Sequence, residues 1–164
     1  MPRLNDIEPS QVLPRTAWHG ALAETAVEVF SIMVGVSVTA PGADVARVPM
    51  QMTGIVGIAG AIRANFILQC SVASSIKLAS QMLGIAPDDP NAQKAACYAL
   101  GEICNIVAGY FKARIGLGDA CKLSVPTIIA GQDYRLYSTA AYEQMELPLL
   151  YEGEVLWATL EIAQ

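Results

Sequence analysis

The stretch from Tyr98 to Lys112 constrains the fold most, because nearly every position in it is apolar or small. Such a run is typical of the middle of a long helix, and Glu102 and Asn105 are its polar exceptions. At about 100° per residue, both share one narrow stripe with Tyr98, Gly109 and Lys112. The opposite side is apolar and predicts a core face, formed by Leu100, Ile103, Cys104, Val107 and Phe111.

Glycines accompany this polar pair. A carboxylate and a carboxamide are costly to bury unpaired, so Glu102 and Asn105 are expected to face water or a partner. Glycine inside a helix costs up to about 1 kcal/mol relative to alanine. Gly101 and Gly109, placed beside the pair, therefore indicate that another backbone or a bulky partner approaches closely.

Length and composition favour one domain with a large apolar core. The chain has 164 residues, 54% of them hydrophobic and 15% charged, and its mean hydropathy is +0.41. This is richer in apolar residues than a typical soluble domain and suggests a further apolar surface, such as a dimer contact. Three prolines in residues 1–15 predict an extended or disordered lead-in before a single domain over residues 16–164.

The charge pattern argues against several classes of protein. The net charge is −5 and the basic residues are scattered, whereas nucleic-acid binders carry a basic patch. No charge-free run reaches the roughly 18 apolar residues of a membrane span, and the N-terminus has no apolar signal core, so we expect a cytoplasmic protein. The four cysteines form no Cys-x-x-Cys pair and His19 is the one histidine, which favours free thiols over a metal site.

Periodicity and turn residues predict a mixed α/β (α+β) fold. Thr16 can cap a first helix, Ser71 and Gly84 bound a second, and Asp89-Pro90 begins the long helix, which ends near residues 116–118. Pro126 indicates an edge strand or a bulge. The remaining segments are predicted to form strands over residues 46–58, 61–70, 120–129, 134–142, 143–150 and 155–162.

At the long helix the sequence is similar to a known family. Gly101-Glu102-x-x-Asn105-x-x-Ala108-Gly109-x-x-Lys112 resembles the signature of the chemotaxis phosphatase CheX family, in the CheC/CheX/FliY group. Further segments match in family order over about residues 16–163: Met52–Gly60, Ala79–Gly84 and Ser124–Gly131. The resemblance implies a CheC-like domain with a mainly antiparallel sheet packed with long helices, and a homodimer whose strands continue across the interface.

The resemblance also implies a reaction. Such proteins dephosphorylate the phospho-aspartate of a CheY-like response regulator, in chemotaxis or related two-component signalling. Asn105 would hold the attacking water in line, and Glu102 would pair with a lysine of the regulator. Mg²⁺ would belong to the regulator, so this chain would have no cofactor or metal of its own. The residues implied to contact the partner are Tyr98, Gly101, Ala108, Gly109 and Lys112.

Other interpretations remain open. CheC-type chains carry a second Glu-x-x-Asn on the first helix, but Glu24 here is followed by Val27 at the fourth place, so one active pair per chain is expected. On chemistry alone, a glutamate and an asparagine three apart are often a solvated helix stripe. The chain could also be a non-catalytic dimerising adaptor that binds a regulator, or a small-ligand domain with a pocket between sheet and helices.

Overall fold

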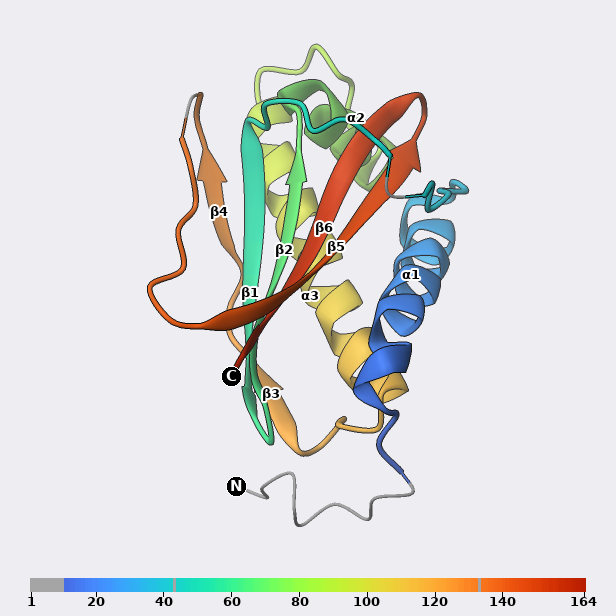
Figure 1. The fold of residues 1–164 in the computed structure, drawn as a ribbon. Coiled ribbons are helices and arrows are strands. Elements are labelled where there is room, and N and C mark those ends of the chain that lie inside the picture. Colours follow the sequence, from blue (N-terminus) through green and yellow to red (C-terminus); the bar gives the residue numbers. More distant parts are fainter. Residues whose placement is uncertain (1–10, 43, 133) are drawn as a thin grey trace.

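A computed structural model describes residues 11–42, 44–132 and 134–164, and the helices and strands of this part are shown in Figure 1. The chain enters through a short 3₁₀ helix, Arg15–Ala17, and a π-helical turn, Phe30–Val34, extends α1. The elements are α1 (Trp18–Val29), β1 (Met52–Gly60), β2 (Arg63–Cys70), α2 (Val72–Leu83), α3 (Ala92–Arg114), β3 (Cys121–Leu123), β4 (Thr127–Ala130), β5 (Tyr142–Tyr151) and β6 (Glu154–Ala163).

The strands form one antiparallel sheet in the order β3-β1-β2-β6-β5. Strand β4 also pairs with β1, on the same side as β3, so both short strands share one edge of the sheet. Ile58 lies opposite Leu123 of β3, and Gly54 lies opposite Ile128 of β4. The mixed α/β class with an antiparallel sheet is confirmed.

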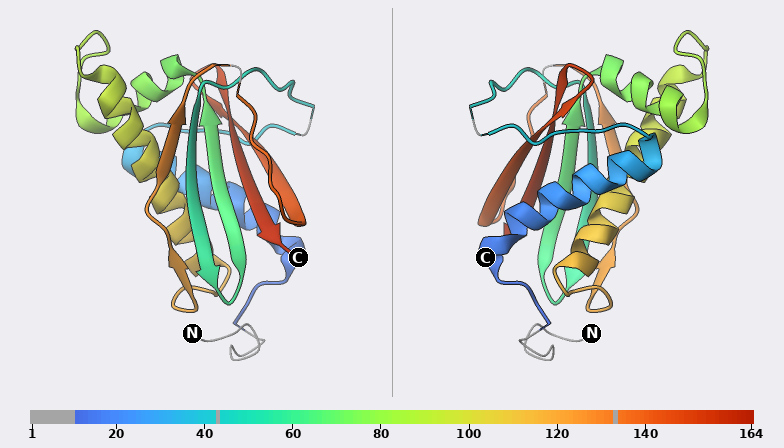
Figure 2. Two further views of the ribbon diagram at one scale, coloured as in Figure 1. Left: turned by 90° about the vertical axis from the view of Figure 1, so that its left-hand side faces the viewer. Right: turned by 90° about the vertical axis from the view of Figure 1, so that its right-hand side faces the viewer.

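Two helices cover one face of this sheet, and α2 packs against α3 (Figure 2). Gly54 allows the contact between α3 and β1, because a Cβ placed there would lie 2.5 Å from the Cys104 Sγ. Trp18 of α1 meets Phe111 of α3 edge to face, with the ring centroids 6.0 Å apart. The apolar side of α3 is therefore the centre of the core, as its periodicity predicts.

Local signals define most helix ends correctly. The Ser71 hydroxyl accepts a hydrogen bond from the Ser74 N–H at 3.0 Å, and Gly84 ends α2 in a left-handed conformation with φ +68°. The predicted cap at Thr16 is wrong, because Thr16 lies inside the 3₁₀ helix that precedes α1. Asp89 caps the turn before α3 by accepting from the Asn91 N–H, and the helix begins at Ala92.

Three strand predictions need correction. The first strand begins at Met52 rather than Ala46, because the Arg47 guanidinium lies over the Trp157 ring and pairs with Glu146, away from the ladder. Residues 120–129 form two strands that are interrupted at Pro126, which cannot donate a ladder hydrogen bond. In the predicted strand 134–142, residues 134–141 form no strand, and β5 begins at Tyr142.

Part of the predicted N-terminal lead-in, residues 1–10, lies outside the described residues. Residues 11–14 are irregular but hydrogen-bonded to the domain. The Leu13 N–H donates to the Ile115 carbonyl at 2.9 Å, and the Leu13 carbonyl accepts from the Trp18 indole at 2.9 Å. Within the described part of the chain, no helix is both long and apolar enough to cross a bilayer.

Replacing two glycines by alanine should change the stability of the protein in opposite directions. At Gly60, φ is +145° and an added Cβ would lie 2.1 Å from the Ala120 carbonyl oxygen, so Gly60→Ala should lower the free energy of unfolding by about 2 kcal/mol or more. At exposed Gly20 in α1, nothing lies within 4 Å of an added Cβ, so Gly20→Ala should raise it by up to about 1 kcal/mol. Urea unfolding measures both. Equal effects of the two variants would contradict this description of the β1 end.

Candidate functional site

The polar pair lies in the middle of α3, on the side that the core leaves uncovered. Glu102 and Asn105 are half-buried, whereas the predicted core residues of the helix are at most 1% exposed. Among the described residues, neither side chain of the pair has a hydrogen-bond or ion-pair partner. A carboxylate and a carboxamide are thus held on a rigid helix with their hydrogen-bonding capacity available.

The other residues of this polar stripe differ in exposure. Tyr98, one turn before Glu102, is 59% exposed, and Gly109 is half-buried. The Lys112 ammonium donates to the Gly118 carbonyl just beyond the helix, so part of its hydrogen-bonding capacity is used within this chain. The roles of Tyr98, Gly109 and Lys112 in partner contact stay predictions.

The connection between β3 and β4, Ser124–Pro126, runs beside the polar stripe. A Cβ on Gly101 would lie 3.5 Å from the Pro126 Cβ, and a Cβ on Gly109 would lie 3.7 Å from the Leu123 Cδ1. The two glycines are separated by about 12 Å along a helix, close to the roughly 10 Å that an extended chain covers from residue 123 to 126. Asn105 is halfway between the glycines, so the connection passes at the level of Asn105.

Two of the residues expected to contact a partner are covered within this chain. Gly101 and Ala108 are both buried within this chain, and Ala108 is 0% exposed. Their predicted contact with a partner would therefore require atoms that this chain itself covers. Gly101, which has no side chain, packs against Pro126 and Ile128 of the same chain. The two glycines do have close neighbours, Leu123 at the end of β3 and Pro126 in the connection that follows, but the sequence did not identify them.

Buried thiols do not supply a nucleophile near the pair. Loss of solvation on burial, and to a smaller extent the Glu154 carboxylate, raise the pKa of Cys70 to about 12. Burial raises the pKa of Cys104 further still. Both thiols are therefore protonated at neutral pH and behave as small apolar core groups.

No group of three or more His, Cys, Asp and Glu side chains within the described ranges is arranged to hold a metal ion. The acidic residues of α1 contact a base instead. The Arg114 guanidinium, at the end of α3, pairs with Glu24 at 3.1 Å and also with Glu28. These ion pairs join the two helices that cover the sheet.

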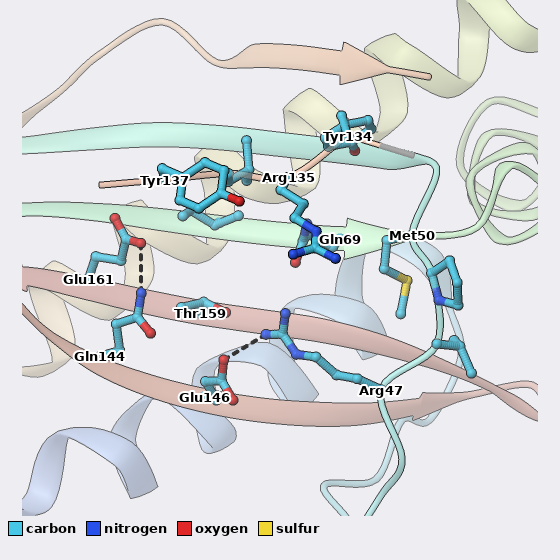
Figure 3. Close-up of a pocket in the computed structure, with 14 residues that line it drawn as sticks. Arg47, Met50, Gln69, Tyr134, Arg135, Tyr137, Gln144, Glu146, Thr159 and Glu161 are labelled. Carbon is cyan, nitrogen blue, oxygen red and sulfur yellow. Dashed lines mark hydrogen bonds and ion pairs between the residues drawn. The ribbon is translucent and has the colours of Figure 1, made fainter. Parts of the chain in front are cut away.

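A polar hollow of about 420 Å³ lies over the other face of the sheet (Figure 3). Gln69 lines it, and Gln69 follows Leu68 of the core, so alternation places it on the face away from α3. Glu161, which is 7% exposed, accepts hydrogen bonds there from Ser138 at 2.8 Å and from Gln144 at 3.0 Å. The hollow is therefore separated from the Glu102–Asn105 pair by the sheet.

Because Gly101 packs against Pro126, the size of a side chain introduced at this position should determine the stability of the variant. An alanine Cβ would make ordinary contact at 3.5 Å and remove a helical glycine, so Gly101→Ala should leave stability unchanged or raise it by up to about 1 kcal/mol. Gly101→Leu must displace Pro126 and should lower the free energy of unfolding by about 1–3 kcal/mol. Chemical unfolding compares the two. If the leucine variant is as stable as the alanine variant, Pro126 does not cover this glycine.

Comparison with known proteins gives consistent results. The family model "Chemotaxis phosphatase CheX" matches residues 52–150, which include the polar pair and Ser124–Pro126. The CheY-P phosphatase CheX of Thermotoga maritima is 24% identical over 109 residues, covering 66% of this chain and 70% of that protein.

Solved structures share the fold. The chemotaxis protein CheX from Vibrio vulnificus superimposes with a TM-score of 0.76 at 15% identity, covering 92% of this chain and 99% of that chain. CheX from Borrelia burgdorferi, solved in a complex with CheY, BeF₃ and Mg²⁺, gives a TM-score of 0.73 at 21% identity, covering 90% of this chain and 98% of that chain. The family match, the shared fold and the placement of the pair on α3 lead to one conclusion: this chain belongs to the CheX family of chemotaxis phosphatases.

Proposed function

We propose that this protein is a phosphatase that hydrolyses the phospho-aspartate of a CheY-like response regulator, with Asn105 and Glu102 as its catalytic residues. The observation that carries the proposal is the pair itself, a carboxamide and a carboxylate that share one face of α3 and have no partner among the described side chains. The name of the Thermotoga maritima relative, a CheY-P phosphatase, supports the choice of substrate.

Asn105 suits the task of positioning water. Phosphoryl transfer to water passes through a loose, in-line transition state, so orienting the water contributes more than activating it as a base. A carboxamide both donates and accepts hydrogen bonds and does not titrate. Asn105 lies in the middle of a 23-residue helix, a rigid support that fixes the direction in which the amide approaches the acyl phosphate.

Glu102 suits the task of docking. One turn from Asn105, its carboxylate would pair with a lysine beside the phosphorylated aspartate of the regulator. That pair would lose most of its solvent at the interface, and removing one partner of such a pair costs about 2–5 kcal/mol. Tyr98, at 59% exposure, extends the same contact surface by one helical turn.

In this proposal the Mg²⁺ is held by the regulator, as the Borrelia burgdorferi complex of CheX with CheY, BeF₃ and Mg²⁺ suggests. The chain contributes binding and a positioned water, and water is the nucleophile. We further expect a cytoplasmic homodimer in chemotaxis or a related two-component pathway, in line with the high apolar content of the sequence.

Phosphate release tests the proposal. Response regulators of the same genome are phosphorylated with acetyl phosphate and Mg²⁺, and each is mixed with a substoichiometric amount of this protein. Asn105→Ala should lower kcat by about 100-fold through loss of the positioned water. Glu102→Ala should mainly raise KM through loss of the docking pair.

Gln93→Ala is the matched control, because Gln93 is an exposed amide on the same helix, outside the polar stripe. It should release phosphate at the wild-type rate. Multiple turnovers by wild type and Gln93→Ala, lost in Asn105→Ala, are the expected result. Equal rates for wild type and Asn105→Ala on every regulator would end the catalytic proposal. Stoichiometric binding without turnover would instead identify a regulator-binding adaptor.

A further inference from the structure

We propose that Val125, on the connection that passes at the level of Asn105, is a specificity-determining contact for the receiver domain of the regulator; this inference rests on the proposed function. Val125 is 85% exposed, more than any other large apolar side chain among the described residues. Single exposed apolar side chains are common on protein surfaces. Val125 differs from them because both of its neighbours are anchored and because its connection passes at the level of Asn105.

The backbone on the N-terminal side of Val125 is pinned to the sheet. The Ser124 N–H donates to the Gly57 carbonyl at 2.8 Å, and the Ser124 hydroxyl accepts from the Gly57 N–H at 2.8 Å. Gly57 suits this pairing, because a Cβ there would lie 3.3 Å from the Ser124 Oγ. The same hydroxyl also lies 3.2 Å from the Val125 carbonyl.

The C-terminal side is fixed as well. Pro126 has a restricted φ and packs over Gly101 of α3, and Thr127 then enters the ladder of β4 opposite Ile55. Val125 is thus an exposed residue between two anchored neighbours. An apolar side chain held in this way loses little conformational entropy when a partner covers it.

The connection that carries Val125 passes at the level of Asn105, the proposed catalytic residue. The connection runs from Leu123 at Gly109 to Pro126 at Gly101, and Asn105 lies midway between these glycines. A receiver domain that brings its acyl phosphate to the Asn105 amide must therefore approach the Ser124–Pro126 connection. Val125 and Tyr98 then supply apolar area next to the polar pair, the arrangement of a protein interface with a few anchoring side chains.

The partner is accordingly a receiver domain with an apolar patch next to its phosphorylation site. Regulators that carry a charged or strongly polar residue at the matching position should be poor substrates, because their polar group would lose solvent against Val125 without gaining a hydrogen bond. Val125 would thereby select among the receiver domains of one cell, while Asn105 performs the same task for each of them.

Steady-state phosphate release and affinity test this inference. Val125→Ser should raise KM about tenfold, the effect expected for failing to bury a valine side chain, and kcat should change less than about twofold. Val125→Ile keeps the apolar contact and should retain the wild-type KM. Ile32→Ser is the matched control, because Ile32 is a 64% exposed apolar residue in the turn that extends α1. The affinity of each variant for the same receiver domain, loaded with beryllofluoride and Mg²⁺, should follow KM.

Each outcome separates this inference from the phosphatase proposal. If Val125→Ser matches Ile32→Ser in KM and affinity while wild type turns over, the role of Val125 is refuted and the phosphatase proposal stands. If wild type binds the loaded receiver without turnover and Val125→Ser weakens that binding about tenfold, the docking role stands and catalysis fails. If wild type neither binds nor turns over any receiver, both are overturned.

Discussion

The close approach of the sheet edge to helix α3 is the constraint on which the candidate site depends. Pro126 and Leu123 pack over Gly101 and Gly109 so closely that a Cβ at either glycine would be in van der Waals contact and a larger side chain would displace them. On the core side the fit is tighter, because even a Cβ at Gly54 would lie 2.5 Å from the Cys104 Sγ. The helix is thereby fixed between the sheet and its edge connection. A residue on the remaining open stripe, such as Asn105, is held in a defined direction by packing that does not involve its own side chain.

Glu102 and Asn105 differ from several other polar residues on the surface in having no partner within the part of the chain that the structure describes. Surface glutamates elsewhere in the structure contact basic residues, as Glu24 does with Arg114 and Glu146 with Arg47. Glu102 and Asn105 have no such partner among the described residues, and the anchored Ser124–Pro126 connection passes at the level of Asn105. A partner that covers the stripe would therefore find hydrogen-bonding groups that are already oriented, which lowers the entropic cost of a productive complex.

Features that depend on a few neighbouring residues, such as helix faces and helix ends, could be predicted from the sequence. Features that depend on contacts between distant segments could not. Periodicity placed the core face of α3, and Ser71 and Gly84 defined α2, because these signals act over a few residues. The start of β1 involves contacts between distant segments, such as that of Arg47 with Trp157. Residues 134–141 form no strand, although their composition is typical of one. The glycines of α3 indicated a close neighbour, but a glycine does not show which distant residue packs against it, so the packing of Pro126 over Gly101 was not predicted.

The most direct measurement of the central claim is an NMR titration of the isotope-labelled protein with a receiver domain loaded with beryllofluoride and Mg²⁺. If the polar stripe of α3 is the docking site, the side-chain amide signal of Asn105 should shift, together with the backbone signals of Glu102 and Val125. The signals of Gln69 and Gln144, in the hollow on the opposite face, should stay in place. Shifts confined to Gln69 and Gln144, with the Asn105 amide unchanged, would show that the receiver domain does not dock on the polar stripe of α3.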